Sequence, residues 1–387
     1  MKSTALRIAF FLTLSLVLIS SYVFAQQTKF NVVTSAVPFL RISPDARAGS
    51  MGELSLATDP DASSSYFNLG KVPFNTSVGG VNVTYTPWLK KIVNDVYLAS
   101  LAGYYKLDDQ QAISASFRYF SLGSIQLTDA FGNPLQSVNP KEFGVDFGYS
   151  RKLSDHLGLG IGLKYIYSNL AQGVSGYKAG NSVAADIGLY YNGHNEAGQG
   201  WAFGAALTNL GAKIGYSNNA DEKDFIPANL GLGTTYTKVI DESNKISFGI
   251  DINKLLVPTP PMFKNDPPTA EDSAILVDYR KKGVVSSWFS SFGDAPDGFS
   301  EELKEFQIST GLEYSYNNQF AVRAGYFYEN KYKGNRRYFT TGVGIKYNVF
   351  ELNFSYLVPS GSGISQNPLS NTLRFSLVFD FDGGSEE

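Results

Sequence analysis

The stretch "LGLGIGLKYIY", residues 157–167, alternates large apolar side chains with residues that are mostly glycine or lysine. The same period of two recurs in "EFGVDFGYS", "ISFGIDI" and "LRFSLVFDF". In a β-strand, successive side chains point to opposite faces of the sheet. The pattern therefore predicts strands that have one apolar face and one face of small or polar residues.

Fourteen such segments follow one another through most of the chain. Most have about ten residues, the length at which a tilted strand crosses an outer membrane. They lie near 78–88, 95–106, 111–122, 142–153, 156–168, 182–192, 200–210, 228–238, 245–254, 306–316, 319–329, 338–347, 350–358 and 371–381.

The connections between these segments alternate between short and mostly long. Residues 154–156 and 317–318 are short joints, whereas 123–141 and 255–305 are long ones. Transmembrane barrels have short turns on the periplasmic side and long loops on the extracellular side. The even number of strands then predicts that the N- and C-termini both lie on the periplasmic side.

The less apolar face of the strands is rich in Gly, Ala, Ser and Thr and carries charges of both signs. A soluble sandwich or propeller would also alternate, but its outer face would be strongly polar. We therefore interpret the chain as an all-β, transmembrane antiparallel β-barrel of about 14 strands, with lipid outside and a narrow polar lumen. A soluble all-β protein is the alternative. The candidate lumen charges are Arg118, Asp146, Lys164, Asp186, Asp251, Arg323, Lys346 and Arg374.

The segments outside the strands complete the predicted organisation. Residues 1–25 have the basic start, apolar run and small residues before Gln26 of a signal peptide, and the run is too short for a membrane anchor. Residues 26–77 are rich in Gly, Ala, Ser and Asp and predict a plug that enters the lumen from the periplasmic side, or else a flexible arm. The barrel covers 78–381, and 382–387 form a C-terminal tail.

The connection 255–305 is long for an extracellular loop and contains apolar residues. Loops of this length usually serve a function. Its apolar side chains indicate either a partner surface or packing of the loop onto the barrel mouth. The candidate contacts for a partner are Leu255, Leu256, Val257, Pro258, Trp288, Phe289, Phe292 and Phe299.

Composition narrows the possible functions. The 387 residues include no cysteine, so disulfides and thiolate chemistry are excluded, and a net charge of −3 gives no basic field for nucleic acid. The only two histidines, His156 and His194, are not spaced for metal or triad chemistry. The glycines of 157–164 lie on one face of a strand, which argues against a dinucleotide-binding loop. We expect no cofactor and no enzymatic activity.

Several stretches are similar to known families. "DARAGSMGELSLATDPDASSSYFNLGK", residues 45–71, followed by fourteen strands, resembles the FadL-like fatty-acid transporter superfamily of barrels. "DINKLLVPTPP" at 251–261 and "SEELKEF" at 300–306 look more specifically like the PorV family, outer-membrane barrels of the type IX secretion system of Bacteroidetes. One departure is "YFNLGK" at 66–71, where relatives tend to carry a Trp-Asn-Pro-Ala type of sequence.

This resemblance implies a non-enzymatic role in protein export at the cell outer membrane. Members of the family bind the C-terminal signal domain of cargo that leaves the translocon barrel, and shuttle it to the sortase-containing attachment complex. The implied partners are the type IX translocon barrel, cargo signal domains, that attachment complex and outer-membrane lipid. The alternative is a FadL-like transporter of hydrophobic small molecules, which needs an apolar pocket in the lumen and a strand kink or gap near the plug.

Overall fold

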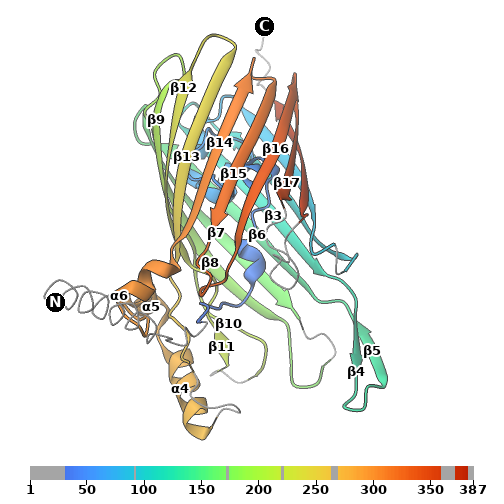
Figure 1. Cartoon of the computed structure of the whole chain (residues 1–387). Helices are drawn as coiled ribbons and strands as arrows, with labels where there is room; N and C mark the ends of the chain where they lie inside the picture. The colour runs from blue at the N-terminus through green and yellow to red at the C-terminus, as the bar shows by residue number, and fades with distance from the viewer. Residues whose placement is uncertain are drawn as a thin grey trace, which may run out of the picture. The chain divides into compact units, whose positions relative to one another are not determined.

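In the computed structural model, the described residues form fourteen antiparallel strands that close into a barrel (Figure 1). Each strand pairs with its neighbour along the chain, and the last pairs with the first. The strands are β1 (Gly79–Pro87), β2 (Val96–Lys106), β3 (Gln111–Leu122), β6 (Lys141–Lys152), β7 (Leu157–Asn169), β8 (Gly180–Asn192), β9 (Gly200–Gly211), β12 (Asn229–Val239), β13 (Asn244–Leu255), β14 (Gln307–Tyr316), β15 (Phe320–Tyr328), β16 (Arg337–Tyr347), β17 (Phe350–Val358) and β18 (Leu373–Phe381).

The structure describes residues 31–90, 93–170, 174–218, 222–262, 269–358 and 371–381. The chain divides into two units, Met1–Asn31 and Val32–Glu387, and the barrel belongs to the second. The predicted signal peptide and the tail at 382–387 lie outside the described residues. The predicted strands agree with the observed ones to within about two residues, because side-chain parity marks a strand whose two faces differ.

The outer face of the barrel is apolar. In β7 the side chains of Ile161 and Leu163 are more than half exposed, whereas Gly160 and Lys164, which flank this pair along the strand, face inward and are buried. Aromatic side chains gather at both ends of the wall: Tyr85, Tyr97 and Tyr119 near one end, and Phe350, Phe379 and Phe381 near the other. Such a wall fits contact with lipid between two aromatic belts.

The two ends of the barrel differ in their connections. At the short-turn end, 153–156, 240–243, 317–319 and 348–349 join neighbouring strands. Asn317, Asn318 and Asn348 have left-handed backbones there, a conformation that asparagine tolerates in tight hairpins. At the opposite end, which we call the loop end, 123–140, 212–228, 256–306 and 329–336 are longer.

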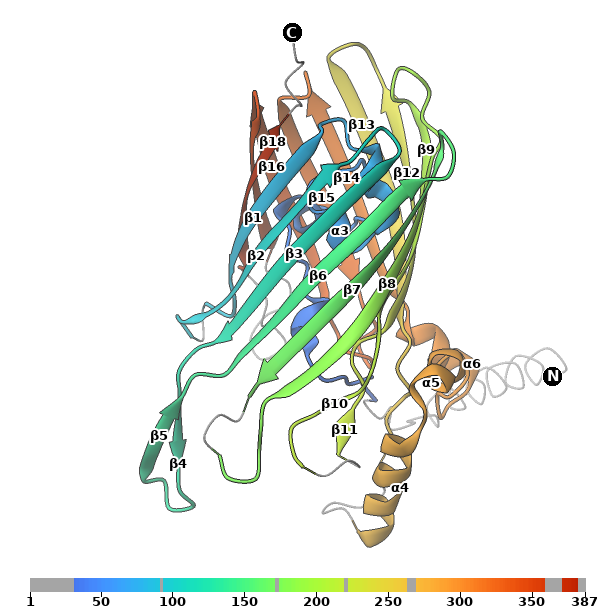
Figure 2. The ribbon, with the colours of Figure 1, turned by 180° about the vertical axis from the view of Figure 1, so that it is seen from behind.

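The loop end carries secondary structure of its own (Figures 1 and 2). A hairpin, β4 (Ile125–Thr128) with β5 (Pro134–Val138), extends β3 and β6, and the two-residue strands β10 (Ile214–Gly215) and β11 (Lys223–Asp224) pair between β9 and β12. Between β13 and β14 lie α4 (Ala270–Lys281), α5 (Val284–Ser290), α6 (Phe299–Glu302) and η3 (Leu303–Glu305). Among the described residues, no helix has the length and apolarity needed to cross a membrane.

The described part of the segment before β1 lies inside the barrel, and we call it the plug. It contains η1 (Pro38–Arg41), α2 (Ala46–Ser50), α3 (Ser64–Phe67) and η2 (Leu69–Phe74). Residues 50–56 follow the inner wall from β16 to β9, and 68–70 continue along β8, β7 and β6. The many small residues predicted on the inner face are what allow this backbone to lie against the wall.

The plug enters the barrel from the loop end, which differs from the prediction of entry at the short-turn end. Val33 packs with Phe225, Leu255 and Val257, and the Ala36 N–H donates to the Phe225 carbonyl at 2.9 Å. The described chain thus begins among the loops and reaches the short-turn end only at Gly79, which pairs with Phe381. Strand parity gives no information about a segment that does not cross the membrane. Here the course of the segment depends on burial of apolar side chains, of Val33 at the loops and of Val37 and Phe39 against the loop-end parts of the strands.

Candidate functional site

The first group of predicted lumen charges forms one cluster between wall and plug. Lys164 lies 3.2 Å from a carboxylate oxygen of Asp146 and 2.9 Å from one of Asp186. Arg118 lies 3.6 Å from Asp146, and its guanidinium stacks 4.3 Å over the ring of Tyr66 in the plug. Because the lysine and the arginine are almost fully buried, each needs these opposite charges or this aromatic face to offset its lost hydration.

The second group fastens the plug directly. Asp251 on β13 accepts hydrogen bonds from the backbone N–H groups of Ser55, at 2.7 Å, and Leu56, at 2.9 Å. Arg374 on β18 pairs with Glu53 of the plug at 2.9 Å. These bonds satisfy plug groups that would otherwise be buried without partners.

Arg323 forms a network with Glu313 and with Arg47, a plug residue that sequence reasoning missed. It contacts Glu313 on β14, and Glu313 also receives two hydrogen bonds from the guanidinium of Arg47 in the plug, at 2.9 and 3.0 Å. A bidentate pair of this kind is directional as well as strong. Arg47 lies in the glycine- and alanine-rich stretch "DARAGS", where nothing in the sequence indicates its distant partner.

Lys346 is the one member of the predicted set that does not join the buried lumen networks. Its side chain is 36% exposed and pairs with Asp380 at 2.9 Å. Both residues lie near the short-turn end, where β16 and β18 finish. The parity of Lys346 is inward, and its pairing with Asp380 joins the inner faces of β16 and β18 near their ends.

A bulge in the wall adjoins the plug. The register of β8 against β9 shifts between Ala185 and Ile187, and Asn209 has a positive φ of 57°. Its N–H donates to Asp186 at 2.6 Å, its side-chain oxygen accepts from Lys164 at 2.6 Å, and its amide donates to the Pro227 carbonyl at 3.0 Å. The bulge is therefore fully hydrogen-bonded at Asn209.

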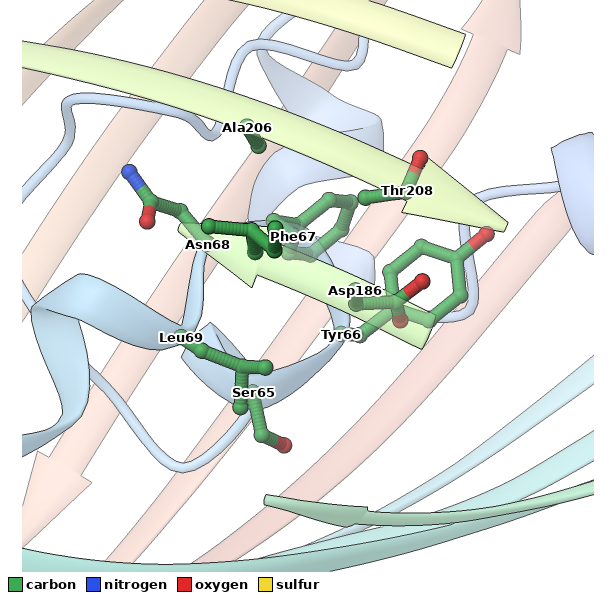
Figure 3. A pocket seen from close by; sticks show the side chains of 9 residues that line it. Ser65, Tyr66, Phe67, Asn68, Leu69, Asp186, Ala206 and Thr208 are labelled. Carbon is green, nitrogen blue, oxygen red and sulfur yellow. The ribbon is translucent and has the colours of Figure 1, made fainter. Parts of the chain in front are cut away.

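Figure 3 shows the crevice beside this bulge. Plug residues 65–69 line it together with Asp186, Ile187, Ala206 and Thr208. It has no room for a water molecule. Asn68 closes the gap by donating from its side chain to the carbonyls of Leu56 and Leu189. At this place the wall deviates from regular pairing, but it does not provide the apolar pocket that a hydrophobic ligand would need.

At the loop end, residues 284–306 form a segment that we call the shelf. It contains α5, α6 and η3. The shelf is held by a buried network in which Lys254 donates to Glu302 at 3.1 Å and to Glu305 at 2.7 Å. Lys333 pairs with Glu305 at 2.9 Å and with Glu301. Two stretches that carry the family resemblance, "DINKLLVPTPP" and "SEELKEF", therefore meet at Lys254.

The position of Lys254 shows where the shelf lies. Lys254 has the same strand parity as Phe248 and Ile252, whose side chains face outward, yet only 1% of it is exposed. Besides the two glutamates, the rings of Phe292 and Phe306 lie 5.5 Å from its amino group. The shelf is thus packed on the outer side of β13 and β14, beside the wall (Figure 1).

The predicted contact residues divide into two groups. Leu255, Leu256, Val257 and Pro258 are buried, so the expectation that they offer a surface to a partner is corrected. They support the loop, since Leu255 and Val257 pack with Val33 and Phe225. On the shelf, Trp288 is half-buried, whereas Phe292 is 46%, Phe289 75% and Phe299 76% exposed.

Other loop-end features were not predicted from the sequence. Lys213 donates to the carbonyls of Arg280 and Lys282 at the end of α4, and Arg280 pairs with Asp224 at 3.0 Å. These contacts join the loop 212–228 to the loop 256–306. The acidic run of "SEELKEF" and the basic run "KYKGNRR" at 331–337 could have indicated that charges meet here. Among the described residues, no group of His, Asp and Glu side chains could hold a metal ion.

The model of the type IX secretion system protein PorV matches residues 24–262, which is more than half of the chain. The chain belongs to the PorV family. The match ends before α4 and the shelf, so the features of 269–306 lie beyond the matched residues. Membership and the closed barrel place the protein in the outer membrane as a component of type IX secretion. Among curated proteins, no significant match was found.

Among solved structures, the CymD monoaromatic hydrocarbon channel shows the same barrel fold. It has a TM-score of 0.52 and 11% identity, over 87% of this chain and 97% of the channel. The Ralstonia pickettii toluene transporter TbuX has a TM-score of 0.48 and 12% identity, over 88% and 98%. A Pseudomonas aeruginosa FadL homologue has a TM-score of 0.45 and 11% identity, over 88% and 99%.

Proposed function

We propose that the protein is a non-enzymatic carrier in type IX secretion. It binds the C-terminal signal domain of cargo that has left the translocon and passes the cargo to the attachment complex at the cell surface. In this proposal the short-turn end faces the periplasm and the loop end faces outward. The filled lumen carries the proposal: because the plug occupies the bore, the barrel has to handle cargo with its exposed surfaces.

Two elements extend beyond the barrel at the loop end and are the proposed cargo contacts (Figures 1 and 2). The β4–β5 hairpin carries Phe131 in its turn, where the side chain is 91% exposed. Helix α4 exposes Ile275 and Val277. Exposed apolar side chains on projecting elements are typical of partner surfaces. Leu255 to Pro258 are unsuitable because they are buried.

Site-specific photo-crosslinking tests the contact surface. A photoreactive residue at Phe131 or Ile275 is expected to capture cargo through its C-terminal signal domain. The same residue at Phe147, which is exposed on the outer wall, serves as the control and is expected to capture none. Equal capture at Phe147, or no cargo at either loop position, would reject this surface.

The cellular role is tested by replacing the same side chains. Phe131→Ser with Ile275→Ser should leave the barrel folded and cause unattached cargo to accumulate. Leu153→Ser, which alters an exposed apolar residue at the short-turn end, is the matched control. Normal surface attachment in the double variant would contradict the proposed role.

The bulge at Asn209 and its crevice favour a second candidate, a transporter of hydrophobic small molecules. It would require the plug to move away from β8 and β9 to open a pocket. Mild detergent extraction followed by analysis of bound proteins and bound lipids separates the two. Cargo or translocon components are expected for the carrier, and a defined hydrophobic compound in the purified barrel for the transporter.

A further inference from the structure

The shelf brings exposed aromatic side chains beside the barrel wall. Its inner side is fixed: Val284 packs against the cluster of Val33, Phe225, Leu255 and Val257, and Ser287 is fully buried. The other side of α5 carries Val285 and Phe289, which are one helical turn apart, and both are more than half exposed. Phe299 and Leu303, also one turn apart, are exposed in α6 and η3.

The wall below the shelf is the lipid-facing surface. Ile252 on β13 and Leu312 on β14 point outward and are about two-fifths exposed. On β13, Lys254 is the next outward-facing position after Ile252 toward the loop end. Next to β14, Phe306 is the position that follows Ile308 in the same direction. The shelf therefore begins at the point where the apolar outer face of these two strands ends.

We infer that the shelf lies in the interfacial layer of the outer leaflet, and that Phe289 and Phe299 contact lipid there. The inference rests on the outer-membrane location of the barrel and is independent of cargo binding. Continuity with the lipid-facing wall is the main argument, because an aromatic side chain gains most from an environment that is apolar on one side and wet on the other.

The burial of Lys254 by shelf residues also supports the position of the shelf at the lipid interface. A lysine in a lipid-facing row has either to reach the aqueous layer or to be neutralised. Here Glu302 and Glu305 neutralise it under the rings of Phe292 and Phe306. Helix α4 and the β4–β5 hairpin project beyond the end of the barrel (Figure 2). The shelf differs from them because it lies beside the wall.

The absence of cysteine from the sequence allows a direct test. Single variants Phe289→Cys, Phe299→Cys and Val285→Cys would carry an environment-sensitive fluorophore in phosphatidylcholine vesicles. Quenching would be measured with doxyl-labelled phosphatidylcholine and with iodide in the water. Leu163→Cys, in the middle of the lipid-facing wall, is the lipid control, and Phe131→Cys is the aqueous control. Heat-modifiable gel mobility confirms that each barrel is folded.

The expected result is strong quenching of the shelf labels by lipid-borne doxyl groups placed near the headgroup, together with loss of iodide quenching relative to Phe131→Cys. Labels at Leu163 should respond best to doxyl groups placed deeper in the acyl chain. Shelf labels that behave like Phe131→Cys overturn the inference. It is also overturned if a photoreactive residue at Phe289 in native outer membranes captures a protein and no lipid, which would make the shelf a protein-docking surface.

Discussion

At the scale of single residues, glycine determines how the lumen is filled. In nine neighbouring strands, from β6 round to β16, a Cβ added to an inward glycine would lie within 3.0 Å of a plug atom. At Gly204 the nearest atom is the Leu56 carbonyl oxygen at 2.1 Å, and at Gly325 it is the Met51 carbonyl carbon at 2.0 Å. Backbone atoms of this kind cannot move aside as the end of a flexible side chain can.

Substitution at Gly204 should loosen the plug. Gly204→Ala is expected to destabilise the protein by about 1–3 kcal/mol, the usual cost of overpacking a well-packed interior. Gly144→Ala is the matched control, because a Cβ on that inward glycine would meet its nearest neighbours at 3.8 Å. Thermal unfolding in detergent, followed by gel mobility, measures both. A variant at Gly204 as stable as the one at Gly144 would contradict the close approach.

At the scale of elements, the shelf is attached by charge and hydrogen bonding more than by a large apolar core. Glu302 accepts from the Ala295 N–H at 2.7 Å, and Thr259 donates to Glu305 at 2.9 Å, so the glutamates also hold the backbone of 256–306. Removal of one partner from such a buried network leaves an uncompensated charge.

Loss of Lys254 should therefore detach the shelf without opening the barrel. Lys254→Met is expected to weaken shelf attachment by up to about 3–5 kcal/mol, the range for breaking a buried ion pair. Trypsin cleavage at Lys281, Lys282 and Lys304 should become faster, while gel mobility reports an intact barrel. Lys238→Met, which removes an exposed lysine of β12, is the control and should cleave at the rate of the unaltered protein.

The attachment should also weaken in acid. Burial raises the pKa of Glu301, but hydrogen bonds from Lys333 and from the Asp297 N–H outweigh this and hold the pKa below its usual value of 4.5. The ionised form is thus favoured by folding, so its contribution is present above about pH 4.5 and is lost as the pH falls below that value. Hydrogen exchange of 284–306 should rise over this range. Glu301→Gln should remove that part of the pH dependence, and an unchanged profile would speak against it.

At the scale of the whole molecule, the plug lies inside the barrel and is bonded to its inner wall. It runs from the loop end at Val33 to the short-turn end at Gly79, and it is fixed to the wall on β13, β14 and β18 by Asp251, Glu313 and Arg374. Because these anchors lie on different strands, no single contact holds the plug.

A plug that fills the bore predicts that the reconstituted protein is closed to small solutes. Liposomes that contain it should not swell in sugar solutions. A variant without 38–74 should give swelling wherever gel mobility shows a folded barrel, because the plug then no longer fills the bore between the inward glycines and charges. Swelling with the complete protein would show that the plug leaves a path through the lumen.

Much of the fold could be predicted from side-chain parity, but little of the site could. The alternation of apolar and polar residues located the fourteen strands, and apolar residues of that pattern, such as Ile161 and Leu163, face outward. Parity also marked Lys254 as outward, yet it could not show that Glu302 and Glu305, some fifty residues later, cover it. The same limit applies to Arg47 and Glu313, and to the buried position of Leu255 to Pro258, since these depend on contacts between distant segments.

The sequence by itself determined the strand number, the two faces of the wall and the alternation of short and long connections, because a period of two is local and a slip of one residue would turn every side chain to the wrong face. Only the tertiary structure decided that the plug enters from the loop end, which charges pair across the lumen, and that the shelf lies against the outside of β13 and β14. Those outcomes depend on which buried groups find partners once the barrel has closed, and such pairing between distant segments leaves no periodic trace along the chain.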